Sequence, residues 1–163
     1  MDGEALQIAP LAARDLAACA ALMAGGDPWV RYGVTADAAA RLWDGALREH
    51  AAVSVARLGQ RTVGFAWYIP RGGFGLSGYL KLLGVDAAAQ GKGVGGALLA
   101  HTERRTLADG QDDLLLLVSE FNDAAQRFYQ HQGYQQIGRL ADYVAPGIAE
   151  LIYRKRLRLD GEA

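Results

Sequence analysis

Cysteine and histidine are scarce in this sequence, which holds one cysteine and three histidines in 163 residues. The single cysteine, Cys19, excludes an intramolecular disulfide. It lies in an apolar stretch with helical periodicity, Leu16 to Met23, and we interpret it as a buried structural thiol rather than as a nucleophile. The histidines and Cys19 show none of the paired spacings of a zinc site, so we expect no metal ion.

Charge of one sign and long hydrophobic runs are also missing. The net charge of −1 gives no global field for nucleic acid or an anionic membrane, and the aromatic residues and arginines do not form a platform for single-stranded nucleic acid. No apolar run approaches the ~20 residues of a membrane span, and the first residues, with Asp2 and Glu4, do not resemble a signal peptide. We therefore expect a soluble, cytoplasmic protein in which residues 1–163 form one domain with its own core.

Glycine is abundant, and a group of glycines separates an apolar strand from a helix. The pattern predicts a strand at Tyr79 to Val85, a connector at Asp86 to Ala89, a glycine loop at Gln90 to Gly96, and a helix from Val94 to Ala108. The start of a helix therefore follows shortly after the end of a strand.

This order suits the binding of a phosphate group. The first turn of a helix leaves backbone N–H groups without partners and carries a partial positive charge. Gly91, Gly93, Gly95 and Gly96 lack the Cβ atoms that would hold a phosphate away, and they permit positive φ angles. Lys92, inside the loop, either screens phosphate charge or points to solvent. We therefore expect a phosphorylated ligand here.

Two nucleotide-binding motifs and a purely structural turn compete for this loop. The Walker motif fails because Gly93, rather than Ser or Thr, follows Lys92. The dinucleotide fingerprint GxGxxG fits at Gly91, Gly93 and Gly96, with Glu120 as a ribose-binding acid, but several residues separate this loop from the end of the strand. The loop by itself leaves a dinucleotide site and a simple glycine-rich turn open.

Periodicity and turn residues predict the other elements. Pro70 to Gly75 has the composition of a flexible loop, and the charged tail, Arg154 to Ala163, that of a solvated segment. In the N-terminal half we expect a strand at Ala5–Ala9, a helix from Ala12 to Gly25, a helix from Ala36 to His50 with Thr35 as its N-cap, and an antiparallel hairpin of Ala52–Arg57 and Arg61–Ile69. In the C-terminal half we expect a buried strand at Leu114–Val118 and then a helix that is capped by Asn122 or Asp123 and ended by Gly133. The last two strands are expected at Tyr134–Leu140 and Gly147–Leu157.

Two motifs resemble those of the Gcn5-related N-acetyltransferases (GNAT family). Gln90-Gly91-Lys92-Gly93-Val94-Gly95 is similar to the family's Q/R-x-x-G-x-G/A signature, and the strand before it ends in the family's Leu-x-Val. The second motif, N-x-x-A-x-x-(F/L)-Y-x-x-x-G-(F/Y), is matched in residue type and spacing by Asn122, Ala125, Phe128, Tyr129, Gly133 and Tyr134. The resemblance covers Gly78 to Gly138 well, and the N-terminal part only in the order of its elements.

The resemblance implies an α/β (α+β) acyl-CoA N-acyltransferase fold, a single domain with a mixed, bent sheet of six or seven strands and helices on both faces. It implies acetyl-CoA as co-substrate, lying between the strands Tyr79–Val85 and Leu114–Val118. Family members often dimerise, and a homodimer is left open. The implied cofactor-binding residues are Leu83, Gly84, Val85, Gln90, Gly91, Lys92, Gly93, Val94, Gly95, Gly96, Asn122 and Phe128.

Tyr129 is the catalytic residue that the resemblance implies. Acyl transfer from a thioester to an amine needs a neutral amine, a stabilised oxyanion and a proton for the thiolate. The matching tyrosine of the family lies beside the CoA sulfur as general acid, and the alternative for Tyr129 is a core aromatic. Asn122 is implied to contact the pantetheine arm or an ordered water, or it serves as a helix cap. A backbone N–H near Leu83 to Val85 is expected to bind the oxyanion.

The general base has no counterpart to carry over. Members of the family that modify protein N-termini carry Glu where this chain has Leu117, and others use a carboxylate on the central strand, where this chain has Tyr79 and Lys81. Glu120 and Asp142 are the nearest carboxylates, and deprotonation through water needs neither.

Aromatic residues indicate the acceptor pocket. The proposed lining suits a small primary amine, an amino-acid-like compound or a peptide, and the alternative for these side chains is ordinary packing. A non-catalytic acyl-CoA-binding module of the same fold is the rival function. The expected substrate-binding residues are Trp29, Tyr32, Trp67, Tyr68 and Tyr143.

Overall fold

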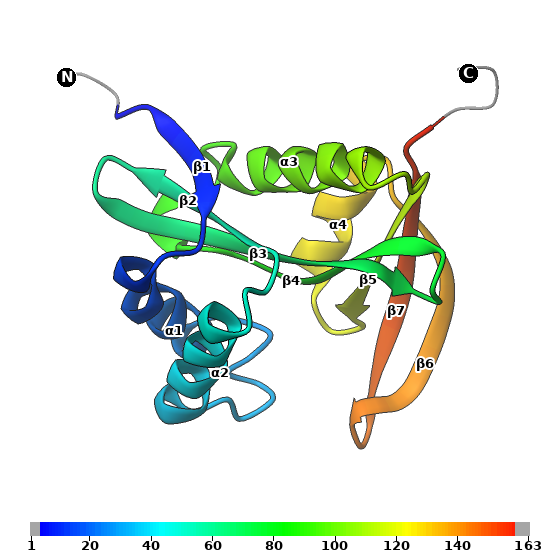
Figure 1. Cartoon of the computed structure of the whole chain (residues 1–163). Coiled ribbons are helices and arrows are strands. Elements are labelled where there is room, and N and C mark those ends of the chain that lie inside the picture. Colours follow the sequence, from blue (N-terminus) through cyan, green and yellow to red (C-terminus); the bar gives the residue numbers. More distant parts are fainter. Residues whose placement is uncertain (1–3, 159–163) are drawn as a thin grey trace. The chain divides into compact units, whose positions relative to one another are not determined.

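The computed structural model describes residues 4–158, which form one seven-stranded mixed sheet and four α-helices (Figure 1). The strand order is β1-β2-β3-β4-β5-β7-β6, with β4 parallel to β5 and the other assigned pairs antiparallel. None of the helices within residues 4–158 is long and apolar enough to cross a membrane. The elements are β1 Leu6–Pro10, α1 Leu16–Gly25, α2 Ala36–Arg48, β2 Val53–Leu58, β3 Arg61–Gly73, β4 Ser77–Val85, α3 Val94–Ala108, β5 Asp113–Ser119, α4 Asp123–His131, β6 Gln135–Ala145 and β7 Ile148–Arg156.

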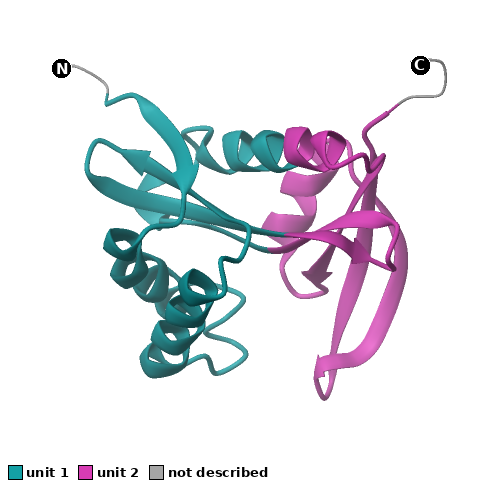
Figure 2. Ribbon diagram, in the orientation of Figure 1, with its two compact units in different colours: residues 1–68, 82–102 teal, residues 69–81, 103–163 magenta. Residues whose placement is uncertain are grey.

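The chain divides into two compact units, shown in teal and magenta in Figure 2. Residues 1–68 and 82–102 form unit 1, and residues 69–81 and 103–163 form unit 2. The chain therefore passes from unit 2 to unit 1 within β4 and back again within α3. That residues 1–163 act as one domain stays a prediction.

In unit 1, helices cover both sides of the strands (Figure 1). On one side, Val94 and Leu98 of α3 approach Gly64 of β3 so closely that a Cβ atom there would lie 3.3 and 3.1 Å from them. On the other side, Trp43 of α2 packs on Phe65, with ring centroids 4.5 Å apart. Trp43 and Phe65 are fully buried, so aromatic packing anchors this helix to the strands.

Unit 1 also contains a buried ion pair. Asp15 accepts hydrogen bonds from the Arg57 Nε atom at 2.9 Å, the Thr62 hydroxyl at 2.6 Å and the Ala12 amide at 2.8 Å. Burial alone would raise the pKa of Asp15, but these donors outweigh it and hold the pKa below its usual value. The pair links the start of α1 to β2 and β3.

In unit 2, alternate residues of β7 face opposite sides of the sheet. Tyr153 and Lys155 point toward the helices, because the Tyr153 hydroxyl accepts from Gln130 of α4 at 3.3 Å and Lys155 binds Glu103 of α3 at 3.0 Å. Arg154 pairs with Asp113 of β5 at 2.9 Å on the opposite side. Unit 2 therefore has one face covered by helices and a second face that carries the even-numbered residues of β7.

One sequence prediction is wrong in part. The segment Pro70 to Gly75 is not wholly a loop, because β3 continues to Gly73. Gly72 and Gly73 allow this extension, since Cβ atoms there would lie 2.9 Å from the Tyr79 side chain and 3.0 Å from Ser77.

The charged tail was expected to be solvated from Arg154 onward, and Arg154 to Arg156 are half-buried or exposed residues of β7, within the strand predicted at Gly147–Leu157. Their charges are paired with Asp113 and Glu103. The remainder of the predicted tail, from residue 159, lies outside the described residues.

Candidate acetyl-CoA and acceptor site

The glycine loop has an exposed backbone with open space beside it. Gly91 and Gly93 have φ angles of 74° and 80°, a region that favours glycine, and both are exposed. A Cβ atom at either position would meet nothing within 4 Å, so the space beside the backbone is open. Helix α3 begins at Val94, as predicted, and its first-turn amides lie at the end of this loop. The loop is therefore open to a ligand, and its binding of a phosphate group stays a prediction.

The end of β4 is shaped by packing inside unit 1. A Cβ atom at Gly84 would lie 2.6 Å from Phe65, 2.9 Å from Leu22 and 2.9 Å from Trp29. The packing explains this glycine without a ligand. Leu83 and Val85 on either side are half-buried, and the Gln90 side chain donates to the Val85 carbonyl at 3.3 Å. The expected contacts of this segment with a cofactor stay predictions.

Tyr129 on α4 is a buried phenol held by other rings. Its ring meets Phe128 and Tyr134 edge-on, with centroids 5.1 and 5.7 Å apart. Burial raises the pKa of Tyr129 well above its ordinary value. Within residues 4–158 its hydroxyl forms no hydrogen bond, whereas the Tyr134 hydroxyl donates to Glu103 at 3.0 Å. Tyr129 is therefore protonated at neutral pH, and its role as general acid stays a prediction.

Asn122 caps α4, one of the two roles considered for it. Its side-chain oxygen accepts from the Ala125 amide at 3.1 Å. The cap aligns the first turn of the helix on which Phe128 and Tyr129 lie. A contact between Asn122 and a cofactor stays a prediction.

The two carboxylates considered as general bases are engaged elsewhere. Glu120 is exposed and pairs with Arg139 through two bonds of 3.0 and 3.1 Å. The hydrogen bonds from Arg139 lower the pKa of Glu120, which makes it a weaker base. Asp142 has a φ of 54° and accepts from the Gly147 amide at 2.6 Å, so it shapes the turn between β6 and β7.

The aromatic residues expected to bind the acceptor fall into both units. In unit 1, Trp29 and Trp67 are buried and belong to one aromatic cluster. The ring centroids of Trp29 and Phe65 are 5.6 Å apart, those of Trp43 and Trp67 are 5.9 Å apart, and Trp43 packs on Phe65. Tyr68 of unit 1 is buried and Tyr32 is half-buried, whereas Tyr143 of unit 2 is 62% exposed. The roles of these five residues in acceptor binding stay predictions.

A carboxylate that the sequence reasoning missed is buried in unit 2. Glu150 of β7 is only 4% exposed, and its oxygens accept from the Ser119 hydroxyl at 3.1 and 3.3 Å. The signal was present in the sequence, because Glu150 is the one charged residue in the apolar run Ile148–Tyr153.

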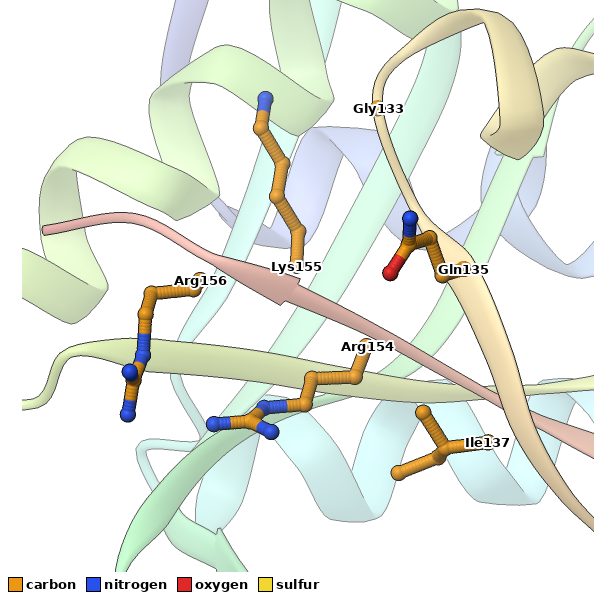
Figure 3. Close-up of a pocket in the computed structure, with 6 residues that line it drawn as sticks. All are labelled: Gly133, Gln135, Ile137, Arg154, Lys155 and Arg156. Atoms are coloured by element: carbon orange, nitrogen blue, oxygen red, sulfur yellow. The ribbon is translucent and has the colours of Figure 1, made fainter. Parts of the chain in front are cut away.

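A shallow hollow of about 350 Å³ surrounds the end of β7 (Figure 3). Figure 3 shows Lys155 on one side of the strand and Arg154 and Arg156 on the other. Glu103 and Asp113 already neutralise these cations at 2.9 to 3.7 Å. The hollow is therefore a weak candidate for an anion site. Its lining residues are Gly133, Gln135, Ile137, Arg154, Lys155 and Arg156.

Residues 49–136, more than half of the chain, match the family model described as Acetyltransferase (GNAT) domain. The chain therefore belongs to the GNAT acetyltransferase family, as its two motifs predict. Among residues 4–158, no group of three His, Cys, Asp or Glu side chains is placed to hold a metal ion.

Curated relatives match over part of their length. A mycothiol acetyltransferase from Mycolicibacterium vanbaalenii is 39% identical over 75 residues, which are 43% of this chain and 25% of that protein. A second, from Mycolicibacterium gilvum, is 38% identical over 73 residues, 42% of this chain and 24% of that protein. The match thus spans about a quarter of the length of these relatives.

Solved structures share the fold over nearly the whole chain. A GNAT-family acetyltransferase structure from Desulfovibrio desulfuricans has a TM-score of 0.80 at 22% identity and covers 94% of this chain and 100% of its own. A ribosomal-protein-alanine N-acetyltransferase from Brucella melitensis has a TM-score of 0.74 at 23% identity, with 92% and 99% covered. These similarities confirm the predicted fold class.

Proposed function

We propose that this protein transfers the acetyl group of acetyl-CoA directly to a primary amine. The observation that carries the proposal is the open glycine loop before α3, with Gly91 and Gly93 at positive φ and no atom within 4 Å of the positions of their absent Cβ atoms. The family supplies the reaction class. Among similar solved structures, one from Salmonella typhimurium is described with its cofactor acetyl-CoA.

The glycine loop is assigned to the pyrophosphate of acetyl-CoA. The amides of the first turn of α3 donate to phosphate oxygens, and the exposed Lys92 screens their charge. Bound acetyl-CoA supplies the activated thioester. A backbone N–H near Leu83 to Val85 is assigned to the carbonyl oxygen, on which negative charge develops during attack.

We assign to Tyr129 the role of hydrogen-bond donor to the sulfur atom that leaves as CoA. Since burial keeps its pKa high, the phenol holds its proton throughout the neutral range and donates a hydrogen bond as negative charge grows on the thiolate. The edge-on contacts with Phe128 and Tyr134 restrict the ring, so the hydroxyl keeps a fixed direction.

We propose only the class of the acceptor, which is a primary amine on a small molecule, an amino-acid-like compound or a peptide. The names of similar proteins include a mycothiol acetyltransferase and a ribosomal-protein-alanine N-acetyltransferase. Because these names give different acceptors, the proposal extends only to the primary amine.

The test is a CoA-release assay with a panel of amines that spans amino acids, polyamines, aminoglycosides and short peptides with free N-termini. We expect acetyl-CoA to be consumed faster with at least one class of amine than without amine, and mass spectrometry to find the acetylated product. Binding of acetyl-CoA without turnover of any amine would indicate the non-catalytic module. Binding of NAD without competition from CoA would indicate a dinucleotide site.

A further inference from the structure

Glu103 of α3 is the centre of a polar cluster in unit 2. It accepts a hydrogen bond from the Tyr134 hydroxyl at 3.0 Å and forms an ion pair with the Lys155 ammonium, also at 3.0 Å. That ammonium lies 5.7 Å from the centre of the Tyr134 ring, within range of a cation–π interaction. Tyr134 is buried, and the side chains of Lys155 and Glu103 are 29% and 19% exposed, so solvent screens these interactions only partly. The cluster therefore joins α3, the segment that follows α4, and β7.

This cluster fixes the position of Tyr134. The Tyr134 amide donates to the Tyr129 carbonyl at 3.0 Å, in the turn that ends α4. A Cβ atom at Gly133, which has a φ of 88°, would lie 3.5 Å from the Lys155 side chain, so the stem of this lysine runs along the same turn. Burial, and then the charge of Glu103, raise the pKa of the Tyr134 phenol far above its usual value, so the phenol remains a donor. The hydroxyl, the backbone and the ring face of Tyr134 are thus each held by a partner.

The orientation of Tyr129 depends on Tyr134. The two rings meet edge-on, with centroids 5.7 Å apart and an angle of 69° between their planes. No hydrogen bond within residues 4–158 holds the Tyr129 hydroxyl, so the rings around it set its direction. Phe128, the other ring in contact, is adjacent on α4 and moves with that helix. Tyr134, by contrast, is anchored to α3 and β7 through Glu103 and Lys155, and it therefore links Tyr129 to elements outside α4.

We propose that Glu103 is a positioning residue for acetyl transfer, which acts through Tyr134 to direct the Tyr129 hydroxyl at the sulfur of acetyl-CoA. The inference rests on the proposed acetyltransferase function and on the role assigned to Tyr129. Hydrogen bonds weaken steeply when the donor points away from the acceptor, so a small rotation of the Tyr129 ring should slow the chemical step. Binding of acetyl-CoA, which is assigned to the glycine loop, should not change. Lys155 supports this role by holding the Glu103 carboxylate beside the phenol.

The first test measures kcat and the KM for acetyl-CoA with the best amine of the panel. Tyr134→Phe keeps the ring but removes the hydroxyl that Glu103 binds, and we expect it to lower kcat by about tenfold while KM stays within about twofold. Glu103→Ala should lower kcat by a similar factor. Glu103→Gln should lower it less, because the amide keeps an oxygen that can accept from the Tyr134 hydroxyl. This order of effects follows the hydrogen bond rather than the charge alone.

Asp113→Asn is the matched control for the Glu103 variants. The side chain of Asp113 is 18% exposed, close to the value for Glu103, and it also pairs with a cation of β7 in unit 2. Its partner Arg154, however, lies on the face of the sheet opposite to Lys155. We expect Asp113→Asn to leave kcat within about twofold of the wild type, although it also removes an ion pair. A tenfold loss of kcat in Asp113→Asn would assign the effect to lost ion pairing in general and overturn the positioning role.

A double-mutant cycle separates positioning from general stabilisation. If Tyr134 acts through Tyr129, Tyr134→Phe should lower kcat by about tenfold in the wild type and by less than about twofold in the Tyr129→Phe background. The same cycle with Glu103→Ala in place of Tyr134→Phe gives a second, independent measurement. An equal loss in both backgrounds, or wild-type kcat in Tyr134→Phe and Glu103→Ala, would overturn the positioning role while the acetyltransferase function stands. If the wild type neither binds acetyl-CoA nor acetylates an amine, both proposals fall.

Discussion

Asp15 and Arg57, which are 42 residues apart in the sequence, form an ion pair with both side chains almost fully buried. The carboxylate of Asp15 also accepts from Thr62 and from the Ala12 amide, so its oxygens are fully engaged. The pair joins α1 to the β2–β3 hairpin inside unit 1. Its energetic weight should therefore appear in the stability of the fold.

Asp15→Asn should lower the free energy of unfolding by about 3–5 kcal/mol, because it leaves the Arg57 charge buried without its counterion. The control is Asp44→Asn, which breaks an exposed pair with Arg48 and should change stability by less than about 1 kcal/mol. Urea unfolding followed by circular dichroism gives both values. Equal effects of the two substitutions would contradict the structural role of the buried pair.

The same pair predicts an acid limit to stability. Burial would raise the pKa of Asp15, but the hydrogen bonds from Arg57 and the other donors lower it in the folded state. The unfolded chain, with an ordinary Asp pKa of about 3.9, then binds the proton more readily, so the stabilisation is complete above that pH and is lost as the pH falls through the folded-state pKa. Unfolding midpoints from pH 7 to pH 2 should show the gap between wild type and Asp15→Asn narrowing below about pH 4. A gap that stays constant would argue against this linkage.

Gly84→Ala should destabilise the protein by about 1–3 kcal/mol, because the new Cβ atom would lie 2.6 Å from the Phe65 ring. Gly45→Ala in α2 is its control: no atom lies within 4 Å of the added methyl group, and alanine favours the helix by up to about 1 kcal/mol. Thermal unfolding should therefore move in opposite directions for the two substitutions. A neutral Gly84→Ala would show that Phe65 and Trp29 move aside freely.

Cys19 should be inert toward thiol reagents in the folded protein. It is fully buried, and burial together with the nearby Asp15 raises the pKa of its thiol to about 12. Because the thiolate is the reactive species, a disulfide-exchange reagent at pH 8 should label Cys19 only on the time scale of unfolding. Adding urea to the unfolding midpoint should accelerate labelling, whereas fast labelling without urea would contradict the buried position.

Tyr129→Phe should lower kcat with the best amine by on the order of 100-fold while binding of acetyl-CoA changes little. Tyr153→Phe removes the hydroxyl of another buried tyrosine of unit 2, one that accepts from Gln130, and should leave kcat within about threefold. The raised pKa of Tyr129 also implies that its ionisation does not limit activity anywhere in the neutral range. A change of wild-type activity with pH near pH 7 that is absent from Tyr129→Phe would refute that assignment.

Much of the fold could be predicted from patterns of residues that are close in the sequence. The bounds of α3 follow from the glycine loop and an apolar stripe, and the caps Thr35 and Asn122 accept from Ala38 and Ala125 as expected. These features depend on residues three or four positions apart. The two family motifs likewise consist of residues that lie close together in the sequence.

Features that depend on residues far apart in the sequence could not be predicted. The extension of β3 through Gly72 relies on packing against Tyr79, and the same glycine-rich composition is typical of a loop. The environment of Glu150 relies on Ser119, which is 31 residues away. Sequence spacing favoured Glu120 and Asp142 as bases because they lie near the second motif, whereas the fold commits them to Arg139 and Gly147.

The central claim is that the glycine loop binds acetyl-CoA, and a thermal-shift titration with acetyl-CoA, CoA and NAD tests it most directly. Gly93→Asp places a carboxylate in the loop at a φ of 80°, and Gly110→Asp places one after the other end of α3 at a φ of 76°, with nothing within 4 Å of either position. The two variants thus share the backbone strain and the charge. At about 100 times its Kd, acetyl-CoA should stabilise the wild type and Gly110→Asp by about 2.7 kcal/mol and Gly93→Asp much less. Equal stabilisation of both variants, or stabilisation by NAD and not by acetyl-CoA, would contradict the account.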